Sequence, residues 1–169
     1  MIRLSLVKDK NLNFSTKLHL IFLLFLLFAT AGCRSAKPLP LKYLKLENDF
    51  DEQTLYNFFS SNTSLKEAKK IFSVKENFKQ REEAKLKLLE LAPAERKEKV
   101  KGVFAQFSPS TIPSVPVLIA EGRFKGEKAF FLVEIWASGK EKTFSWVRLW
   151  VFEEGNLRLL YALSFKNPF

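Results

Sequence analysis

The apolar residues of this chain follow a helical period in its middle part and a strand period towards its C-terminus. In the middle part they recur three and four positions apart, as on one face of a helix. Helix-start patterns, in which a capping residue comes three positions before Glu, occur at Asp49 and Ser64. The pattern predicts helices that begin near these two residues, a third helix over 78–92, and a short fourth helix over 94–101 that ends at Gly102.

The C-terminal part follows a Pro- and Ser-rich loop, 108–114, and is mostly β-branched and aromatic. It predicts four strands, over 115–124, 128–137, 142–153 and 157–166. Because the connections are short, we expect each strand to pair antiparallel with the next one, as a meander. The sequence therefore predicts an α+β fold, in which N-terminal helices pack on a C-terminal four-stranded antiparallel meander.

The last predicted hairpin turns at Gly155 and Asn156, which as a two-residue loop would place Trp150 opposite Tyr161. Apolar side chains then occupy both faces of the sheet, so both faces need cover. The predicted helices can cover one face. Strong curvature, the loop over 103–114, a second subunit or a bound apolar ligand can cover the other.

A separate apolar run, 18–29, precedes these elements and follows a basic stretch. Its length of about 12 residues is too short to cross a bilayer, which takes about 20, but is typical of an export signal. Small residues, 30–32, then precede Cys33, the only cysteine of the chain. Residues 28–33 resemble the lipobox of bacterial lipoproteins, in which the cysteine is acylated and becomes the new N-terminus.

The lipoprotein resemblance implies three parts: a cleaved signal peptide over 1–32, a lipidated tether over 33–47 and a single α+β domain over 48–169. Arg34 stands where an Asp holds the enterobacterial lipoproteins that this chain resembles in the inner membrane, so the outer membrane of a bacterial envelope is expected. The alternative is an ordinary secretory peptide followed by a coincidental cysteine. That alternative would leave a lone exposed thiol in an oxidising compartment.

The chain carries 28 Lys and Arg residues against 18 Asp and Glu residues, a formal net charge of +10. For an exported protein, the polyanion that this charge meets is anionic lipid or an envelope polymer rather than nucleic acid. Lysines interspersed with Glu along helices are also typical of any solvated helical face. We expect the membrane as a partner through the lipid anchor, an envelope protein or a second copy as a further partner, and no nucleic acid.

The only histidine, His19, lies inside the predicted signal peptide. Cleavage would leave a domain without His, and acylation of Cys33 would leave it without a free thiol. A zinc site of the usual nitrogen and sulfur type and a His-dependent nucleophile pair are then excluded. We therefore expect no metal, no cofactor and no enzymatic activity, because acid–base chemistry would have to rest on Glu, Asp, Lys or Tyr.

The candidate ligand pocket centres on Arg148, which shares one predicted sheet face with Trp146, Trp150 and Tyr161. A permanently charged guanidinium beside large aromatic rings can hold an anionic or an aromatic ligand. The alternative is a structural arginine that stacks on a core tryptophan or pairs with a carboxylate, since aromatic stripes commonly belong to the core.

Two carboxylates, Glu134 and Glu121, are candidate partners of Arg148. Glu134 belongs to the candidate pocket and lies within an apolar strand, 130–136, where a carboxylate is out of place. It is either a buried acid with a shifted pKa or an edge residue that faces water. Either carboxylate, together with Tyr161, is a candidate acid–base pair.

Helices followed by a curved meander, and the aromatic segment 144–163, resemble the cystatin-like α+β roll of the nuclear transport factor two-like superfamily. The resemblance covers residues 48–166. It implies a cone-shaped pocket between helices and sheet, an outer sheet face that dimerises, and catalysis by Asp, His or Tyr where a member is an enzyme. Without His, the resemblance favours a binding member.

These observations predict a membrane-anchored, non-enzymatic envelope lipoprotein whose domain binds a partner protein or a small ligand. One alternative is a surface-exposed structural or host-facing lipoprotein that uses an apolar sheet face as an interface. The other is an enzyme based on Glu and Tyr within a cystatin-like roll.

Overall fold

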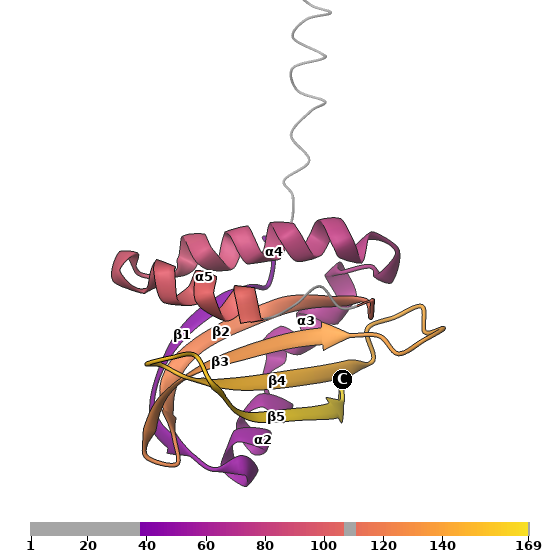
Figure 1. Cartoon of the computed structure of the whole chain (residues 1–169). Helices are drawn as coiled ribbons and strands as arrows, with labels where there is room; N and C mark the ends of the chain where they lie inside the picture. The colour runs from indigo at the N-terminus through magenta and orange to yellow at the C-terminus, as the bar shows by residue number, and fades with distance from the viewer. Residues whose placement is uncertain (1–37, 107–110, 169) are drawn as a thin grey trace, which may run out of the picture. The chain divides into compact units, whose positions relative to one another are not determined.

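A computed structural model describes residues 38–106 and 111–168 of the chain, and Figure 1 shows its architecture. The predicted signal peptide, 1–32, and the predicted acylation site Cys33 lie outside the described residues. The fold is α+β, which confirms the predicted class. Within the described ranges, no helix combines the length and the apolar character needed to span a membrane.

Strand β1 (Lys42–Phe50) comes first in the described chain. Helices follow it, namely α2 (Glu52–Ser60), α3 (Thr63–Ile71), α4 (Asn77–Leu91) and α5 (Lys97–Gln106), with short 3-10 turns at Val74–Glu76 and Ala94–Arg96. The last elements are the strands β2 (Ser114–Phe124), β3 (Glu127–Trp136), β4 (Trp146–Glu153) and β5 (Leu159–Lys166).

The five strands form one mixed sheet in the order β1-β2-β3-β4-β5. Strands β2 to β5 are the antiparallel meander that the sequence predicts. The prediction of only four strands, all after the helices, is wrong, because β1 precedes the helices and pairs parallel with β2. This order also differs from the one implied by the resemblance to the cystatin-like roll. Residues 42–47 thus belong to the sheet and not to the tether.

Strand β1 gives little sequence signal because it lies at the edge of the sheet and is largely exposed. Charged residues, such as Lys45 and Glu47, interrupt its apolar positions. Its pairing begins opposite Leu118, so the first residues of β2 pair with β3 but have no strand on their other side. Helix α4 packs along β2.

Helix α2 begins later than the sequence pattern predicts, and helix α3 begins earlier. Helix α2 is capped by Asp51, not Asp49: the Asp51 carboxylate accepts from the Thr54 amide at 2.8 Å, and the Thr54 hydroxyl accepts from the Asp51 amide at 2.9 Å. Helix α3 is capped by Asn62, whose side chain accepts from the amide of Ser64, so Ser64 lies in the first turn of the helix.

Gly102 lies inside helix α5 and does not end it, contrary to the prediction. A Cβ atom at this position would lie 2.4 Å from Cδ1 of Leu157, in the loop between β4 and β5. The glycine therefore leaves room for the end of the Leu157 side chain against α5.

The register of the β4–β5 hairpin differs from the predicted one. Trp150 lies opposite Ala162, and Tyr161 lies opposite Val151. A two-residue turn is not formed, because the connection runs from residue 154 to residue 158 and a register shift follows Val151. The pairing of β5 is shifted by one residue from the predicted register, and such a shift places each side chain of β5 on the opposite face of the sheet. Tyr161 therefore lies on the face opposite Trp150.

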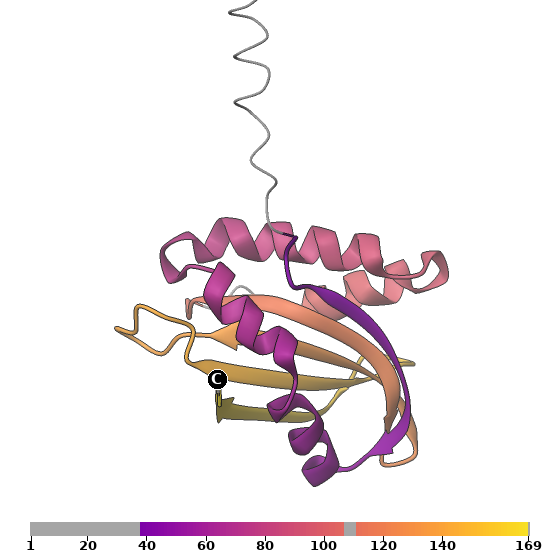
Figure 2. The ribbon, with the colours of Figure 1, turned by 180° about the vertical axis from the view of Figure 1, so that it is seen from behind.

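The two faces of the sheet are covered by different helices. Helices α2 and α3 lie across one face, which Figure 2 shows. Their side chains Phe59 and Leu65 belong to the same buried cluster as Phe131 of β3. Helix α5 covers part of the other face, the α5 face, where Val100 and Val103 pack in one cluster with Phe130, Leu132 and Phe152. The prediction that the helices together cover one face is therefore wrong in one respect, because α5 packs on the face opposite α2 and α3.

Candidate ligand-binding face

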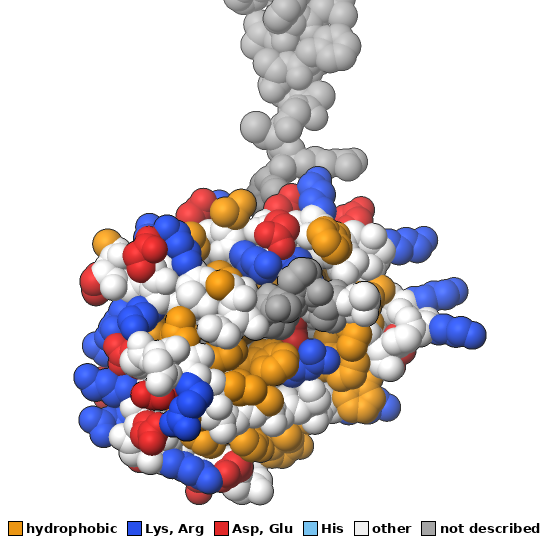
Figure 3. Space-filling view, viewed as in Figure 1, with side chains coloured by type: hydrophobic (Ala, Val, Ile, Leu, Met, Phe, Trp, Pro, Cys, Tyr) orange, Lys and Arg blue, Asp and Glu red, His pale blue; other side chains and the backbone are white. Residues whose placement is uncertain are grey.

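Side chains two residues apart in a strand share a face, so the strand pairing places nine side chains in three rows on the α5 face. The rows are Trp136–Trp146–Lys166, Glu134–Arg148–Ser164 and Leu132–Trp150–Ala162 across β3, β4 and β5. We call these nine residues the tryptophan–arginine face. Figure 3 shows orange side chains gathered over β3, β4 and β5 around a blue one. A polar row thus crosses the sheet between two aromatic rows.

Arg148 lies at the centre of this face and contacts residues on both sides. Its guanidinium carbon lies 4.6 Å from the ring centroid of Trp136 and 5.5 Å from that of Trp150. Its Nη1 lies 3.4 Å from Oε1 of Glu134, and its Nε donates to Oγ of Ser164 at 3.4 Å. Only 17% of the side chain is exposed. The guanidinium is therefore held by two indole rings and by one carboxylate.

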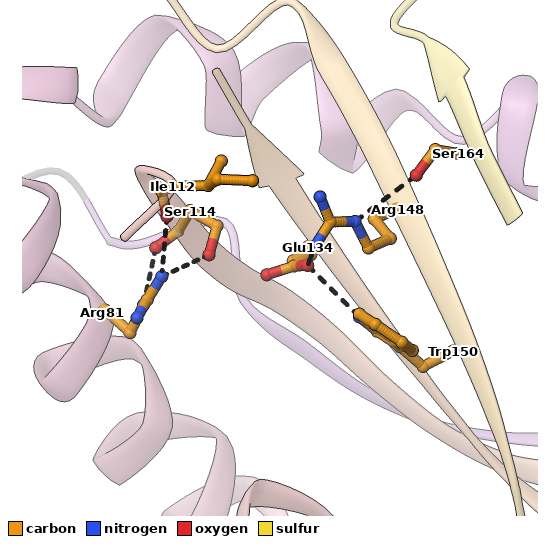
Figure 4. Close-up of polar contacts among 7 residues, drawn as sticks. All are labelled: Arg81, Ile112, Ser114, Glu134, Arg148, Trp150 and Ser164. Atoms are coloured by element: carbon orange, nitrogen blue, oxygen red, sulfur yellow. Dashed lines mark hydrogen bonds and ion pairs between the residues drawn. The ribbon is translucent and has the colours of Figure 1, made fainter. Parts of the chain in front are cut away.

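Glu134 is fully buried at the base of the polar row. Its Oε1 accepts from Nε1 of Trp150 at 3.2 Å, and Figure 4 shows this bond beside the ion pair with Arg148. Burial raises the pKa of Glu134, while the Ser114 hydroxyl, Arg148, Trp150 and Arg81 act in the opposite direction. Its Oε2 has no hydrogen-bond partner among the described residues.

A second buried charge, Arg81 of α4, approaches the same row from the edge of the sheet. Its Nε donates to the carbonyl oxygen of Ser114 at 2.9 Å, and its Nη2 donates to the carbonyl of Ile112 at 3.2 Å and to the Ser114 hydroxyl. Only 2% of Arg81 is exposed. Figure 4 shows Ser114 between Arg81 and Glu134, so polar groups line up from α4 through β2 and β3 to β4.

Two indole N–H groups add donors next to Arg148. The rings of Trp136 and Trp146 stack with 5.4 Å between centroids and 29° between planes. Their Nε1 atoms are buried and have no partner among the described residues. A cation beside three indole rings suits an anionic or an aromatic ligand better than a cationic or a purely apolar one.

The structure brings together four of the five residues that the sequence places in the candidate pocket: Glu134, Trp146, Arg148 and Trp150. Tyr161 is not among them, because its ring lies on the other face and stacks on Phe124 at 5.5 Å. The predicted acid–base pair of Tyr161 with Glu134 is therefore not assembled. The alternative hypothesis for Arg148 was a structural role, in which it stacks on a tryptophan or pairs with a carboxylate. Both contacts are present, with Trp136 and with Glu134.

Glu121, the other candidate partner of Arg148, instead pairs with Arg96 at 2.8 Å, and Arg96 also binds Glu154. This network lines a surface hollow of about 390 Å³ at the other end of the sheet. Its lining mixes four cations with three carboxylates, so it favours neither charge class of ligand. Tyr43, a neighbour of this network, has its pKa raised to about 12 by burial, with Glu121 acting in the same direction.

Sequence reasoning missed Trp136, Ser114 and Arg81. Trp136 comes two residues after Glu134 and so shares its face, a signal that was present. Arg81 comes three residues before Ala84 and seven before Leu88, on the buried side of α4, and a charge at such a position indicates a buried partner. The partner itself, Ser114, is 33 residues away and has no local signal.

No group of three or more His, Cys, Asp or Glu side chains that suits a metal ion occurs in residues 38–106 and 111–168. Comparison with known proteins gives no match: no family model, no curated protein and no solved structure matches this chain.

Proposed function

We propose that this chain is a lipid-anchored protein of the bacterial envelope, whose α+β domain binds a small aromatic or anionic ligand and does not transform it. One observation carries the binding part of the proposal: Arg148 lies between the rings of Trp136 and Trp150, and all three residues are partly exposed. The tryptophan–arginine face is thus the ligand site.

The chemistry of Arg148 supports this ligand class. A guanidinium has five N–H donors and keeps its charge at any physiological pH. Nη1 faces Glu134 and Nε faces Ser164, whereas Nη2 has no such contact among the described residues. An anionic group can therefore add to Arg148 without displacing Glu134, while the neighbouring indole rings contact a flat apolar body.

The anchor part of the proposal rests on the sequence around Cys33. An apolar run of export-signal length ends in small residues before the cysteine, as in bacterial lipoproteins. Leu39, which packs in the domain, comes six residues after this cysteine, a length of chain that spans at most about 20 Å. Arg34 directly after the cysteine supports residence in the outer membrane.

Cell fractionation tests the anchor. We expect the wild-type chain in the membrane fraction and the Cys33→Ala variant in the soluble fraction, because stable attachment of the domain to the bilayer requires the acyl chains. Intact mass spectrometry of the wild-type protein should show a diacylated or triacylated chain that begins at Cys33. A chain that retains residues 1–32, or an unmodified thiol, would contradict the anchor.

Fluorescence titration with two probes tests the ligand site: anilinonaphthalene sulfonate, an aromatic anion, and phenylnaphthylamine, its neutral counterpart. We expect saturable binding with preference for the anion. Arg148→Lys keeps the charge but loses the planar stack on Trp136, so it should weaken binding of the anion several-fold. Arg158→Lys is the matched control, because 65% of the Arg158 side chain is exposed. Equal binding by both variants would overturn the assignment of the site.

A protein partner is the second candidate ligand. Strand β5 ends the sheet, and on the α5 face it presents the exposed residues Ala162, Ser164 and Lys166 beside the tryptophans. An edge strand of this kind can pair with a strand of another chain. Light scattering over a range of protein concentrations would detect pairing with a second copy of the chain. A monomer at every concentration would argue against this pairing and favour a small ligand at the tryptophan–arginine face.

A further inference from the structure

Helix α4 carries the three most exposed large apolar side chains of the described residues. They are Phe78 at 67%, Leu86 at 63% and Leu91 at 51% exposure. Leu86 is two positions from both Ala84 and Leu88, which are buried, and two residues turn a helix by roughly 200°. Leu86 therefore points away from the core. Exposed apolar groups concentrated on one element indicate a contact surface.

The charges on α4 are balanced. Lys79 pairs with Glu83, Lys85 with Glu82 at 2.9 Å, and Lys87 with Glu90 at 2.7 Å. The remaining cation of the helix, Arg81, is buried against Ser114. The outer side of α4 thus offers apolar groups among neutralised charges. A contact with it depends on burial of apolar surface rather than on attraction between opposite charges.

The chain enters the domain beside this helix. Leu39 and Leu41 pack in the same cluster as Ala84 and Leu88 of α4, and β1 contacts α4. Figures 1 and 2 both show the start of β1 against α4. Leu39 comes six residues after Cys33, a length of chain that spans at most about 20 Å. An acyl anchor on Cys33 would therefore keep α4 within about this distance of the bilayer.

We infer that α4 lies on the membrane surface and that Phe78 and Leu86 enter the region between the lipid head groups and the acyl chains. This inference rests on the proposed anchor, which brings the helix to the bilayer. Phe and Leu side chains are typical of helices that lie in this region. Because the lysines of α4 are already paired, the contact forms on neutral lipid as well as on anionic lipid.

An environment-sensitive fluorophore on a single cysteine tests this contact. An acylated Cys33 has no free thiol, so Leu86→Cys in the full acylated chain provides one labelling site. Gln53→Cys is the matched control, since Gln53 is exposed on α2, which Figures 1 and 2 show at the end of the domain opposite α4. Each labelled protein is reconstituted in phosphatidylcholine vesicles, with and without spin-labelled lipid.

We expect the label at position 86 to emit at shorter wavelength than the label at position 53, and to be quenched by the spin-labelled lipid. Replacing Phe78 by Ser in the Leu86→Cys chain should reduce the quenching. Equal emission and equal quenching at both positions in vesicle-bound protein would overturn the inference while leaving the anchor intact. A blue shift without quenching would assign α4 to a protein contact and also overturn it. Failure of the anchor is a separate result, because the protein would then not float with the vesicles.

Discussion

Glu134 and Arg148 face each other across β3 and β4, with 3.4 Å between Oε1 and Nη1, but only one of them is removed from water. The carboxylate is fully buried, whereas 17% of the arginine side chain is exposed. The pair therefore connects the interior of the α5 face to its surface. Burial raises the pKa of the Glu134 carboxyl, and the positive charge of Arg148 lowers it. Burial has the larger effect.

The raised pKa of Glu134 makes stability depend on pH. Between the unfolded pKa of 4.5 and the higher folded pKa, the folded protein binds more protons than the unfolded chain, so the unfolding free energy falls as pH rises. We expect the wild type to lose stability relative to Glu134→Gln from pH 4.5 upwards, until the difference becomes constant above the folded pKa. Urea unfolding at several pH values measures this difference.

Glu98→Gln is the control for this prediction, because 84% of the Glu98 side chain is exposed. The wild type should show no comparable loss of stability relative to Glu98→Gln over the same pH range. A difference between wild type and Glu134→Gln that grows in favour of the wild type as pH rises would mean that Arg148 outweighs burial.

Arg81 is predicted to stabilise the edge of the sheet. Replacing Arg81 by Met removes the buried hydrogen bond from Nε to the carbonyl oxygen of Ser114, and a buried acceptor that loses its donor costs about 1–3 kcal/mol. Lys79→Met is the matched change on the exposed side of the same helix, where 80% of the side chain is exposed. Urea unfolding should give a clearly larger loss for Arg81→Met. Equal losses would show that the buried hydrogen bonds contribute little.

The four strands from β2 onwards could be predicted because their apolar alternation is strong and their connections are short. Strand β1 could not, since its exposed edge position leaves it with charged residues such as Lys45 and Glu47 between its apolar ones. Its partner, β2, comes after all the helices. No local pattern predicts a parallel pairing over such a separation.

The candidate site was predictable where it depends on one strand alone. Trp146, Arg148 and Trp150 share a face because alternate residues of a strand do. Tyr161 was misplaced because its position depends on the loop length and on the register shift after Val151, and neither has a firm sequence signal. Glu134 joins the site only through the β3–β4 register, which the intervening loop sets.

Tyr43 is predicted to be replaceable by Phe without loss of stability. Its hydroxyl is buried and has no hydrogen-bond partner among the described residues, so its removal leaves no acceptor or donor unpaired. The pKa of Tyr43 is raised to about 12, so above the unfolded value of 10.0 the folded state keeps its proton longer, and wild-type stability falls with rising pH. Tyr43→Phe should lack this component in alkaline urea unfolding. A clear loss of stability in Tyr43→Phe at neutral pH would contradict the prediction.

Gly102 and Leu157 are predicted to be coupled. In the middle of a helix, Gly→Ala alone gains up to about 1 kcal/mol of helix propensity. At Gly102, however, the added methyl group would lie 2.4 Å from Cδ1 of Leu157, so the end of this flexible side chain must rotate away. Gly102→Ala should therefore raise the unfolding free energy less in the wild type than in a Leu157→Ala variant, from which the clashing atom is gone. A double-mutant cycle by urea unfolding measures this difference, and the same gain in both backgrounds would show that α5 does not approach the loop as closely as the structure places it.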